Sequence, residues 1–319
     1  MVERVPTAGL NEEVFIGVDL GGTKIAVGTL IGGRLQGVAE EATDRSGQDA
    51  LIAQIARLVG EQVRSARSAT RTVRAVGVGI PSVVEFASGR VRSSVNIPLA
   101  DLPLRGVLEG QLDSLPTYVD NDATCAAIAE AHDEQGALVA TSLVMITVGT
   151  GVGGGIVIDG RPYRGATGAA GEIGHMIVGL DLHERAQASP AFPREGSLES
   201  LASGHALDAL AAAGGYRDGP QLVAAAQGGE QSARDLIGRF AERLGVGVAN
   251  VINIFDPEVV AIGGGVSAAG ELLIEPVRST AGRFVLAGVG TQTELRIARS
   301  GPLAGVRGAA LMARSAVGG

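Results

Sequence analysis

The sequence predicts an α/β protein built from two similar halves, as three observations indicate. Segments with strand and helix patterns alternate along the chain, which is typical of layered α/β domains. The pattern FIGVDLGGTKIAVGTLIGG (15–33) has a counterpart about half a chain later in LVMITVGTGVGGGIVIDGR (143–161). Both run from a strand through a Gly- and Thr-rich turn into a second strand. We therefore expect two similarly built domains with a cleft between them.

Each predicted element follows from its own hydrophobic period, since apolar runs indicate strands and a 3.6-residue period indicates helices. In the first half we expect strands 15–20 and 25–30 as a hairpin, helix 50–63, strand 73–81, strand 116–122 and helix 123–131. In the second half we expect a hairpin that begins with strand 142–149, a long amphipathic helix 231–255, strand 257–267, helix 271–285, an edge strand 293–300 and helix 303–316. The expected domains are 1–118, joined by the C-terminal helix 303–319, and 119–302.

The composition and charge exclude several classes of protein. With 45% hydrophobic and 19% charged residues among 319, the chain can bury one large core or two ordinary ones. A net charge of −8 argues against a broad nucleic-acid surface, which needs clustered Lys and Arg. The densest basic stretch, RSARSATRTVR (64–74), reads as a solvated helix end rather than a DNA-binding arm.

The location of the protein is expected to be the cytoplasm. A single cysteine, Cys125, excludes an intramolecular disulfide and a multi-cysteine zinc site, and it reads as a small core residue. The N-terminal MVERVPTAGLNEEVF lacks the apolar core of a signal peptide. The most apolar run (137–149) is shorter than the roughly 20 residues that span a bilayer, so no membrane partner is expected.

Three glycine-rich turns, DLGGTK (19–24), TVGTGVGGG (147–155) and AIGGGVS (261–267), are candidates for binding an anion with backbone amides. GTGVGG (149–154) matches G-x-G-x-x-G, but a β-branched strand follows it where the dinucleotide fingerprint needs a helix. No P-loop motif occurs. What remains is a polyphosphate held by two hairpin turns that carry hydroxyl donors, Thr23 in the first and Thr147 and Thr150 in the second.

Charged residues beside these turns suggest a metal ion and a polar substrate. Asp19, at the mouth of the first turn, suits a magnesium ion (Mg2+) bound through its water shell. Lys24 is either a phosphate neighbour or a solvated charge. Glu172 and His175 in GEIGHM (171–176) lie three residues apart, on one face of a helix. They read as two metal ligands, as hydrogen-bonding groups for a polar substrate, or as a buried pair that holds a turn.

The ordered set of motifs resembles the ROK family of bacterial sugar kinases and related repressors, from about residue 14 to residue 316. The motifs that carry this resemblance are DLGGTK, GVGIP (77–81), VDNDA (119–123), TVGTGVGGG, GAAGEIGHM (168–176), SLES (197–200) and DPEVVAIGGGVS (256–267). The resemblance implies the actin-like, RNase H-like two-domain ATPase fold, a homodimer, ATP in the cleft, and phosphorylation of a bound sugar. Repressor members carry an N-terminal helix-turn-helix. Only about 14 residues precede the first strand here, so the kinase branch is favoured.

The resemblance also implies individual roles. Asp122 is the expected catalytic base, which takes the proton of a sugar hydroxyl during phosphoryl transfer. The alternative is that it only caps the helix that follows. Sugar-binding residues are expected to be Asn96, Asn121, Glu172, His175 and Glu199. ATP and magnesium contacts are expected from Asp19, Gly21, Gly22, Thr23, Lys24, Thr147, Gly149, Thr150, Gly151, Gly263, Gly264 and Gly265.

Three of these roles have a plain structural alternative. Asn96 is also an ordinary turn residue before Pro98. Glu199 reads nearly as well as a solvated glutamate at a helix start. The glycines at 263–265 serve a tight strand-to-helix turn in either case.

The sequence departs from the family in one segment. Most members follow GEIGH with a cysteine cluster that binds a structural zinc together with the histidine, but residues 183–200 contain no cysteine. Ser197 stands where the last cysteine is expected. A structural zinc needs four ligands, so we predict none, and the loop 180–196 must hold its shape by other means. Phe192 is a candidate anchor for that loop.

We therefore expect an ATP- and Mg2+-dependent sugar kinase without nucleic-acid or membrane partners. Glucose or a close hexose is the leading substrate, phosphorylated at the 6-hydroxyl. N-acetylmannosamine, N-acetylglucosamine, fructose and an amino-deoxyglucose such as kanosamine are alternatives. The rival class is a non-catalytic sugar sensor or transcriptional regulator, against which the intact Asp19, Asp122 and glycine turns argue.

Overall fold

The computed structural model describes residues 12–94, 96–179 and 192–318, and these divide into two compact units. The first unit contains residues 12–125, 133–137 and 305–318, and the second contains 126–132, 138–179 and 192–304. Each unit is defined by the contacts among its own residues. The functional domain limits expected from the sequence, 1–118 with 303–319 and 119–302, stay a prediction.

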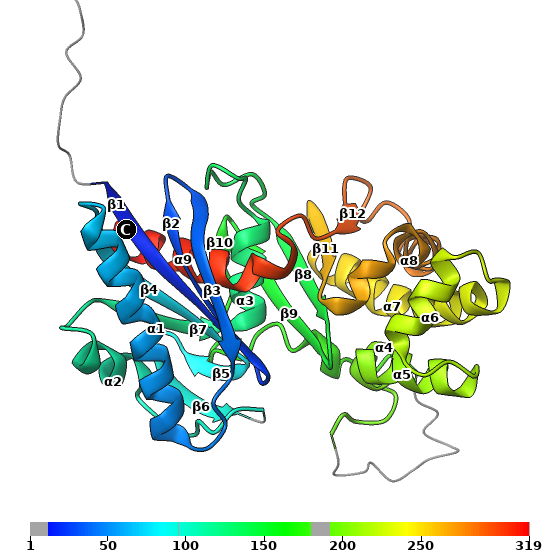
Figure 1. The fold of residues 1–319 in the computed structure, drawn as a ribbon. Helices are drawn as coiled ribbons and strands as arrows, with labels where there is room; N and C mark the ends of the chain where they lie inside the picture. The colour runs from blue at the N-terminus through cyan, green and yellow to red at the C-terminus, as the bar shows by residue number, and fades with distance from the viewer. Residues whose placement is uncertain (1–11, 95, 180–191, 319) are drawn as a thin grey trace, which may run out of the picture. The chain divides into compact units, whose positions relative to one another are not determined.

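The first unit is built on a five-stranded sheet with the order β3-β2-β1-β4-β7 (Figure 1). Its elements are β1 (Glu13–Leu20), β2 (Lys24–Ile31), β3 (Arg34–Ala42), α1 (Gln48–Ser68), β4 (Thr72–Ile80), β5 (Ser82–Glu85), β6 (Arg90–Ser94), α2 (Leu104–Gln111), β7 (Thr117–Asn121) and, from Gly305 on, α9 (Ala304–Gly318). Strands β1 and β2 form the predicted antiparallel hairpin. Strands β4 and β7 extend the sheet in parallel with β1.

The second unit repeats this sheet, with the order β10-β9-β8-β11-β12. Its strands are β8 (Leu143–Val148), β9 (Val152–Ile158), β10 (Arg161–Pro162), β11 (Val259–Gly263) and β12 (Glu294–Ile297). Strands β8 and β9 form an antiparallel hairpin, and β11 and β12 run parallel to β8. The order and directions of the strands match those of the first sheet, so the weak sequence repeat corresponds to a repeated α/β unit.

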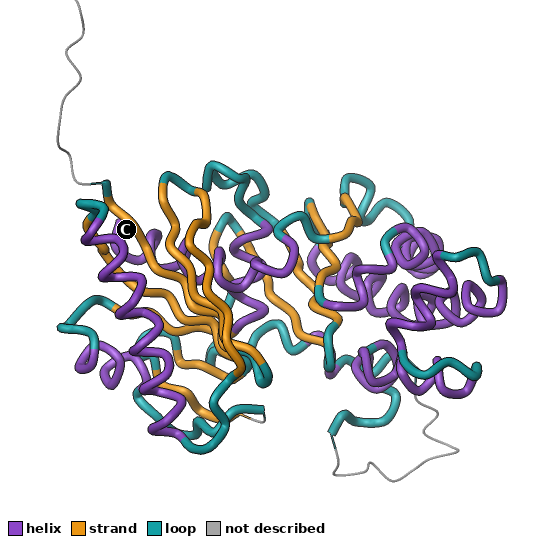
Figure 2. Tube along the Cα trace, viewed as in Figure 1, coloured by secondary structure: helices purple, strands orange, loops and turns teal. Residues whose placement is uncertain are grey.

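Helices make up most of the rest of the second unit, as the purple tubes of Figure 2 show. They are η1 (Ile173–His175), α4 (Leu198–Ala202), α5 (Gly204–Ala213), α6 (Gly219–Gln227), α7 (Gln231–Phe255), η2 (Gly265–Ala269), α8 (Glu271–Phe284) and η3 (Gly301–Leu303). Helix α3 (Asp122–Glu130) begins in the first unit and ends in the second. No helix in the described ranges combines the length and hydropathy that a membrane-spanning segment needs.

The two faces of the first sheet have opposite character because side chains alternate along a strand. One face carries large apolar residues such as Ile16, Val18 and Val76, which pack with Leu51 and Ile55 of α1. On β1 the other face carries Phe15, Gly17 and Asp19 instead. Gly17 gives this second face no side chain at its centre, which leaves room for a helix backbone.

Helix α9 fills that room. Gly17 is the register partner of Gly28 on β2 and of Gly77 on β4, so three glycines form a row across the sheet. A Cβ added at Gly17 would overlap the carbonyl oxygen of Val306, and one at Gly77 would overlap that of Ala309. Because backbone meets backbone here, no larger residue fits without moving α9.

We predict that Gly17→Ala lowers the free energy of unfolding by about 2–3 kcal/mol, because the new methyl group collides with main chain that cannot rotate away. Denaturant unfolding followed by circular dichroism measures this. Gly106→Ala is the matched control, since Gly106 is an exposed residue of α2 with nothing within 4 Å of an added Cβ. It should raise the stability by about 0.5–1 kcal/mol through helix propensity. Equal effects of the two substitutions would contradict the packing argument.

Candidate active-site residues in each unit

Two carboxylates lie at one edge of the first sheet. Asp19 is near the end of β1, and Asp122 follows the last residue of β7. Both strands run parallel to β4, so their carboxyl ends meet at the same edge, where ligands bind in sheets of this kind. Burial raises the pKa of Asp19 to about 7, and the negative charge of Asp122 adds to the shift. The two groups are therefore close enough to influence each other's charge.

Helix α9 explains why Asp19 is shielded. Asp19 is on the same sheet face as Gly17, and a Cβ added at Gly305, near the start of α9, would overlap the Asp19 carboxylate. Among the described residues, no donor is hydrogen-bonded to this carboxylate. A carboxylate with free lone pairs fits a magnesium ion, which usually binds one or two carboxylates and keeps several waters. The donor set at Asp19 therefore fits the expected ion.

The first glycine turn is closed by backbone and hydroxyl hydrogen bonds. The amide of Gly21 donates to the carbonyl of Lys24 at 2.8 Å, and the Thr43 hydroxyl donates to the carbonyl of Gly21 at 2.7 Å. Thr43 was not predicted from the sequence, because it lies 22 residues from Gly21 and no local pattern marks it. Within this turn Thr23 is exposed and its backbone carbonyl accepts from the Thr43 amide.

Lys24 is in the solvated state that the sequence left open. Its ammonium pairs with Glu40 at 2.9 Å, and the two side chains are 50% and 42% exposed. An exposed pair of this kind contributes about 0–1 kcal/mol and is easily exchanged for another partner. Lys24 therefore keeps donors for a phosphate beside its pair with Glu40, since an ammonium group carries three.

The hydrogen bonds at the start of α3 show which side chains cap this helix. The Asn121 side-chain oxygen accepts from the Thr124 amide at 3.1 Å, and the Asn121 amide group donates to the Ser82 carbonyl at 3.4 Å. Asn121 therefore caps the helix through its side-chain oxygen, while its NH2 group makes one weak bond to Ser82. Asp122 accepts from the next amide, Ala123, through Oδ1 at 2.8 Å. The cap does not depend on Asp122 alone, which leaves its carboxylate suited to a proton-accepting role.

Asn96 is exposed and lies beside the first glycine turn. A Cβ added at Gly22 would be 3.2 Å from the Asn96 Cβ. The first unit therefore brings together Asn96, the turn at 21–24 and the Asp19–Asp122 edge.

The second glycine turn is fixed from two sides. The Gly149 amide donates to the Gly151 carbonyl at 3.0 Å, and the Gly204 amide at the start of α5 donates to the Gly149 carbonyl at 2.7 Å. Glu199 of α4 accepts from the Val152 amide at 2.8 Å, and its carboxylate lies against Gly151. Glu199, expected to bind sugar, thus holds the glycine turn at 149–151 in place.

The other residues of the second unit that were predicted to contact ATP lie around this turn. Thr147 is the register partner of Gly153 on β9 and of Gly263 on β11, and Thr150 is exposed at the turn. A Cβ added at Gly264 would overlap the Val148 carbonyl oxygen, so the backbone that follows β11 packs directly on the end of β8. Gly265 is exposed, with open space around it.

The GEIGHM segment is attached to β9 by the same kind of close contact. A Cβ at Gly171 would overlap the Gly154 carbonyl, and one at Gly174 would overlap the Val152 carbonyl. Residues Ile173–His175 form a short 3-10 helix, in which positions three apart share a face. Glu172 and His175 are both exposed and lie 3.7 Å apart between Oε2 and Nε2. The pair is not buried, which removes the reading of a structural buried pair.

The ends of the loop without cysteines are held by backbone pairing. The Val178 amide donates to the Gly196 carbonyl, and the Leu198 amide donates to the Met176 carbonyl, each at 2.8 Å. The Ser197 hydroxyl caps α4 by accepting from the Ser200 amide. Phe192 lies edge-on to the His175 ring, with 5.5 Å between the ring centroids. These contacts supply a fixed base for the loop.

The expected absence of zinc stays a prediction. Among the described residues there is no group of three His, Cys, Asp or Glu side chains that suits a metal ion. The only other histidine considered as a partner for His175, His183, lies in the segment 180–191 outside those residues. Cys125 is in no disulfide and is fully buried against Gly79, as expected for a core position.

The repeated mixed sheets, each with a hairpin turn rich in glycine, define the actin-like, RNase H-like class of two-domain α/β ATPase folds. The chain belongs to the ROK family, whose family model matches residues 15–316. It is similar to a glucokinase of Halalkalibacterium halodurans, at 32% identity over 94% of each chain. It is also similar to an N-acetyl-D-glucosamine kinase of Escherichia coli O127:H6, at 33% identity over 94% of this chain and 99% of the relative.

Two further similarities show the range of the family. A ROK family glucokinase from Streptomyces griseus, solved in complex with glucose and AMPPNP, has a TM-score of 0.76 and 32% identity over 95% of this chain and 99% of that one. A xylose repressor of Caldicellulosiruptor bescii is 30% identical over 84% of this chain and 70% of its own length. The family thus includes proteins named as kinases and as repressors.

We predict that Asp19 makes the protein less stable as the pH rises from about 4 to about 7. A carboxyl whose pKa is raised in the folded state binds more protons folded than unfolded in this window, so deprotonation favours unfolding. At about 1.4 kcal/mol per pKa unit, the loss reaches up to about 4 kcal/mol. In metal-free buffer, Asp19→Asn should flatten the stability profile and be more stable than the unmodified protein at pH 8. Glu134→Gln, at an exposed site, should leave the profile unchanged; an unchanged profile in Asp19→Asn contradicts the prediction.

We predict that Glu199→Ala raises the KM for ATP by about tenfold, because Val152 and the turn at 149–151 lose a charged hydrogen-bond partner worth roughly 1.5–3 kcal/mol. Initial-rate kinetics with both substrates varied give the two KM values. Glu242→Gln, an exposed change on α7, is the control. A rise in the sugar KM alone would restore the sugar-contact role and remove the role in holding the turn.

Proposed function

We propose that this chain is an ATP- and Mg2+-dependent sugar kinase that transfers the γ-phosphate of ATP to a hexose hydroxyl. The observation that carries the proposal is the Asp19–Asp122 pair at one edge of the first sheet. Phosphoryl transfer needs one carboxylate to accept a proton and another group to hold the metal ion. The relatives named glucokinase and N-acetyl-D-glucosamine kinase support this activity. The glucokinase solved with AMPPNP supports ATP as the donor.

Asp122 is proposed as the base. As the sugar hydroxyl oxygen attacks the γ-phosphorus, the hydroxyl proton passes to the Asp122 carboxylate, the bond to the bridging oxygen breaks, and ADP leaves. Mg2+ held through Asp19 would neutralise phosphate charge, and its charge favours the deprotonated Asp19 carboxylate. Asp19 without its ion is half-buried with a pKa of about 7, so its affinity for the metal is expected to rise with pH.

The residues of the second unit are proposed to bind both substrates. Backbone amides of the turn at 149–151, with the hydroxyls of Thr147 and Thr150, suit the phosphates of ATP, and Gly263, Gly264 and Gly265 suit its adenosine side. Glu172 and His175 are exposed and share one face, which suits the hydroxyls of a sugar. In the first unit, Asn96 and the remaining donor of Asn121 are proposed as further sugar contacts.

The sugar is proposed to be glucose or a 2-acylamino hexose, phosphorylated at the 6-hydroxyl. The names of the relatives support both, since one is a glucokinase and another an N-acetyl-D-glucosamine kinase. Fructose, N-acetylmannosamine and kanosamine remain further candidates. We also propose a homodimer, supported by the family resemblance. A cytoplasmic location is proposed because the donor, ATP, is supplied there.

The second candidate is a non-catalytic sugar sensor, supported by the similarity to a xylose repressor. Release of ADP with a panel of sugars distinguishes the two, and mass spectrometry and NMR of the product locate the phosphate. Turnover with one or more sugars is expected. Sugar binding seen by calorimetry without turnover of any sugar supports the sensor.

We predict that Asp122→Asn lowers kcat by about 10²–10⁴-fold, because the amide cannot accept the proton. The Kd of the sugar should stay within about tenfold, since the amide keeps the size and the hydrogen bond of the carboxylate. Steady-state rates and calorimetry measure the two effects. Asp120→Asn is not a suitable control because Asp120 is buried and caps the Asn121 amide; Asp113→Asn, on the surface, is suitable. Retained turnover in Asp122→Asn removes the base role.

A further inference from the structure

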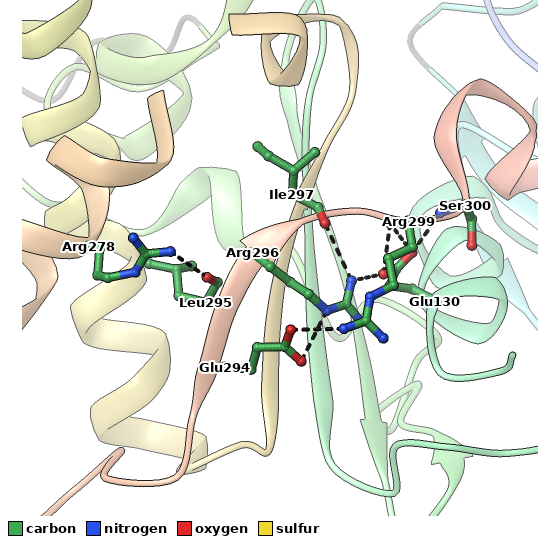
Figure 3. Close-up of polar contacts among 8 residues, drawn as sticks. All are labelled: Glu130, Arg278, Glu294, Leu295, Arg296, Ile297, Arg299 and Ser300. Atoms are coloured by element: carbon green, nitrogen blue, oxygen red, sulfur yellow. Dashed lines mark hydrogen bonds and ion pairs between the residues drawn. The ribbon is translucent and has the colours of Figure 1, made fainter. Parts of the chain in front are cut away.

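A buried carboxylate in the second unit, outside the residues proposed to bind substrate, accepts bonds from two main-chain amides and a guanidinium group. Glu130, the last residue of α3, has a completely buried side chain. Its carboxylate accepts from the Arg299 amide at 3.0 Å and from the Ser300 amide at 3.1 Å, and it pairs with the Arg296 guanidinium (Figure 3). One side chain thus satisfies two main-chain donors and one charged donor.

The cluster around Glu130 is balanced in charge. The Glu294 carboxylate lies 3.3 Å from Nε of Arg296 and accepts from Nη2 of Arg299 at 2.9 Å. Two carboxylates therefore face two guanidinium groups, as the dashed lines of Figure 3 show. The partners differ in exposure, since Glu130 is inaccessible and Glu294 is 50% exposed. Of these two carboxylates, Glu130 accepts from main-chain amides, whereas Glu294 pairs with guanidinium groups.

Stability alone does not account for this arrangement. A buried ion pair is often no more stabilising than apolar residues of the same size, because both charges lose their hydration. What a carboxylate provides and an apolar residue cannot is a pair of acceptors aimed at two successive amides. The geometry of the segment 299–300 relative to the end of α3 is therefore what Glu130 determines.

That segment and α3 are the places where the chain passes between the units. The chain leaves the first unit within α3, after Cys125, and finally returns to it after Ala304, at the start of α9. Glu130 lies on the second-unit side of the first passage, and Ser300 lies on the second-unit side of the last one. The Glu130 carboxylate therefore links the end of α3 to the segment 299–300, next to these two passages.

In the first unit, helix α9 is likewise bonded to the segment 133–137, which follows α3. Arg307 of α9 donates to the Asp133 carbonyl, and Arg314 of α9 donates to the Gly136 carbonyl. The short first-unit segment 133–137 follows α3 closely in the chain. Helix α9 is thereby attached to the segment that continues from α3, in addition to its contact with the glycine row.

We propose that Glu130 is a positioning residue for phosphoryl transfer. It fixes Arg299 and Ser300 to the end of α3, and so sets the placement of Asp122 at the other end of α3 and of Gly305 in α9 against Asp19. The role of Glu130 rests on the proposed base role of Asp122. Glu130 itself lies eight positions from Asp122 and is completely buried, so it acts through the two helices rather than on a substrate.

The test replaces Glu130 by glutamine in the full chain. The amide keeps the size of the side chain but turns an NH2 group toward donors that need an acceptor, so either the Arg296 bond or one main-chain bond is lost. We expect kcat to fall by about 10–100-fold, as misplacement of catalytic groups by about 1 Å does, with the KM values for sugar and ATP within about threefold. A fall in kcat without a change in the KM values is the signature of misplaced catalytic groups, because substrate binding is left intact.

Two control variants separate positioning from stability. Glu294→Gln changes the exposed carboxylate of the same cluster, which pairs with guanidinium groups, and should leave kcat unchanged. Phe240→Leu removes volume from the core of the second unit and should lower the melting temperature without changing kcat well below that temperature. Glu130→Asp keeps the charge with a shorter reach, and its kcat should lie between those of the unmodified protein and Glu130→Gln. It also serves if Glu130→Gln does not fold.

Three outcomes decide the matter. Loss of kcat with unchanged KM values in Glu130→Gln, absent from both controls, supports the positioning role. A kcat equal to that of the unmodified protein in folded Glu130 variants overturns it. A loss of kcat that is matched by a change in the KM values, or that is no larger than that of Phe240→Leu, also overturns it. If Asp122→Asn, measured in parallel, keeps its activity, the base role fails whatever the Glu130 variants show.

Discussion

The close contact between helix α9 and the glycine row of the first sheet is the constraint on which the candidate site depends. Because Gly17 and Gly77 carry no side chain, the helix backbone lies directly on the strands, and Gly305 reaches the Asp19 carboxylate. That contact removes water from Asp19 and is the origin of its raised pKa, which Asp122 then increases. A core contact far along the chain thus sets the chemistry of a residue near its start.

The two sheets share an order of strands but carry different chemistry at their turns. In the first unit the turn lies beside the Asp19–Asp122 edge, which suits proton transfer and a metal ion. In the second unit the turn lies among backbone amides and Glu199, which suits an anion held by main chain. The two turns therefore suit different parts of phosphoryl transfer: a base and a metal-binding carboxylate in the first unit, and main-chain amides for an anion in the second.

The sequence patterns predicted the hairpins, the long helix α7 and the edge strand β12, because periodicity and glycine turns are local signals. The end of α7 at Phe255 has such a signal in Pro257, which cannot continue a helix. Asp256 between them adopts a left-handed conformation. Contacts between distant segments gave no signal: the hold of Thr43 on the first turn spans 22 residues, and that of Glu199 on Val152 spans 47. Glu130 was missed for the same reason, since a lone glutamate at the end of an apolar helix looks like a solvated terminus.

The helical turn that carries His175 shows how close backbone contacts fix the position of an exposed side chain. The contacts of Gly171 and Gly174 with β9 hold this turn through main chain alone. The His175 ring is then exposed beside Phe192, and its Nε2 lies 3.7 Å from Glu172. The two nitrogens of an exposed imidazole can donate or accept hydrogen bonds, and Phe192 adds an apolar surface beside them. A ligand at His175 would therefore meet a polar edge and an aromatic face together.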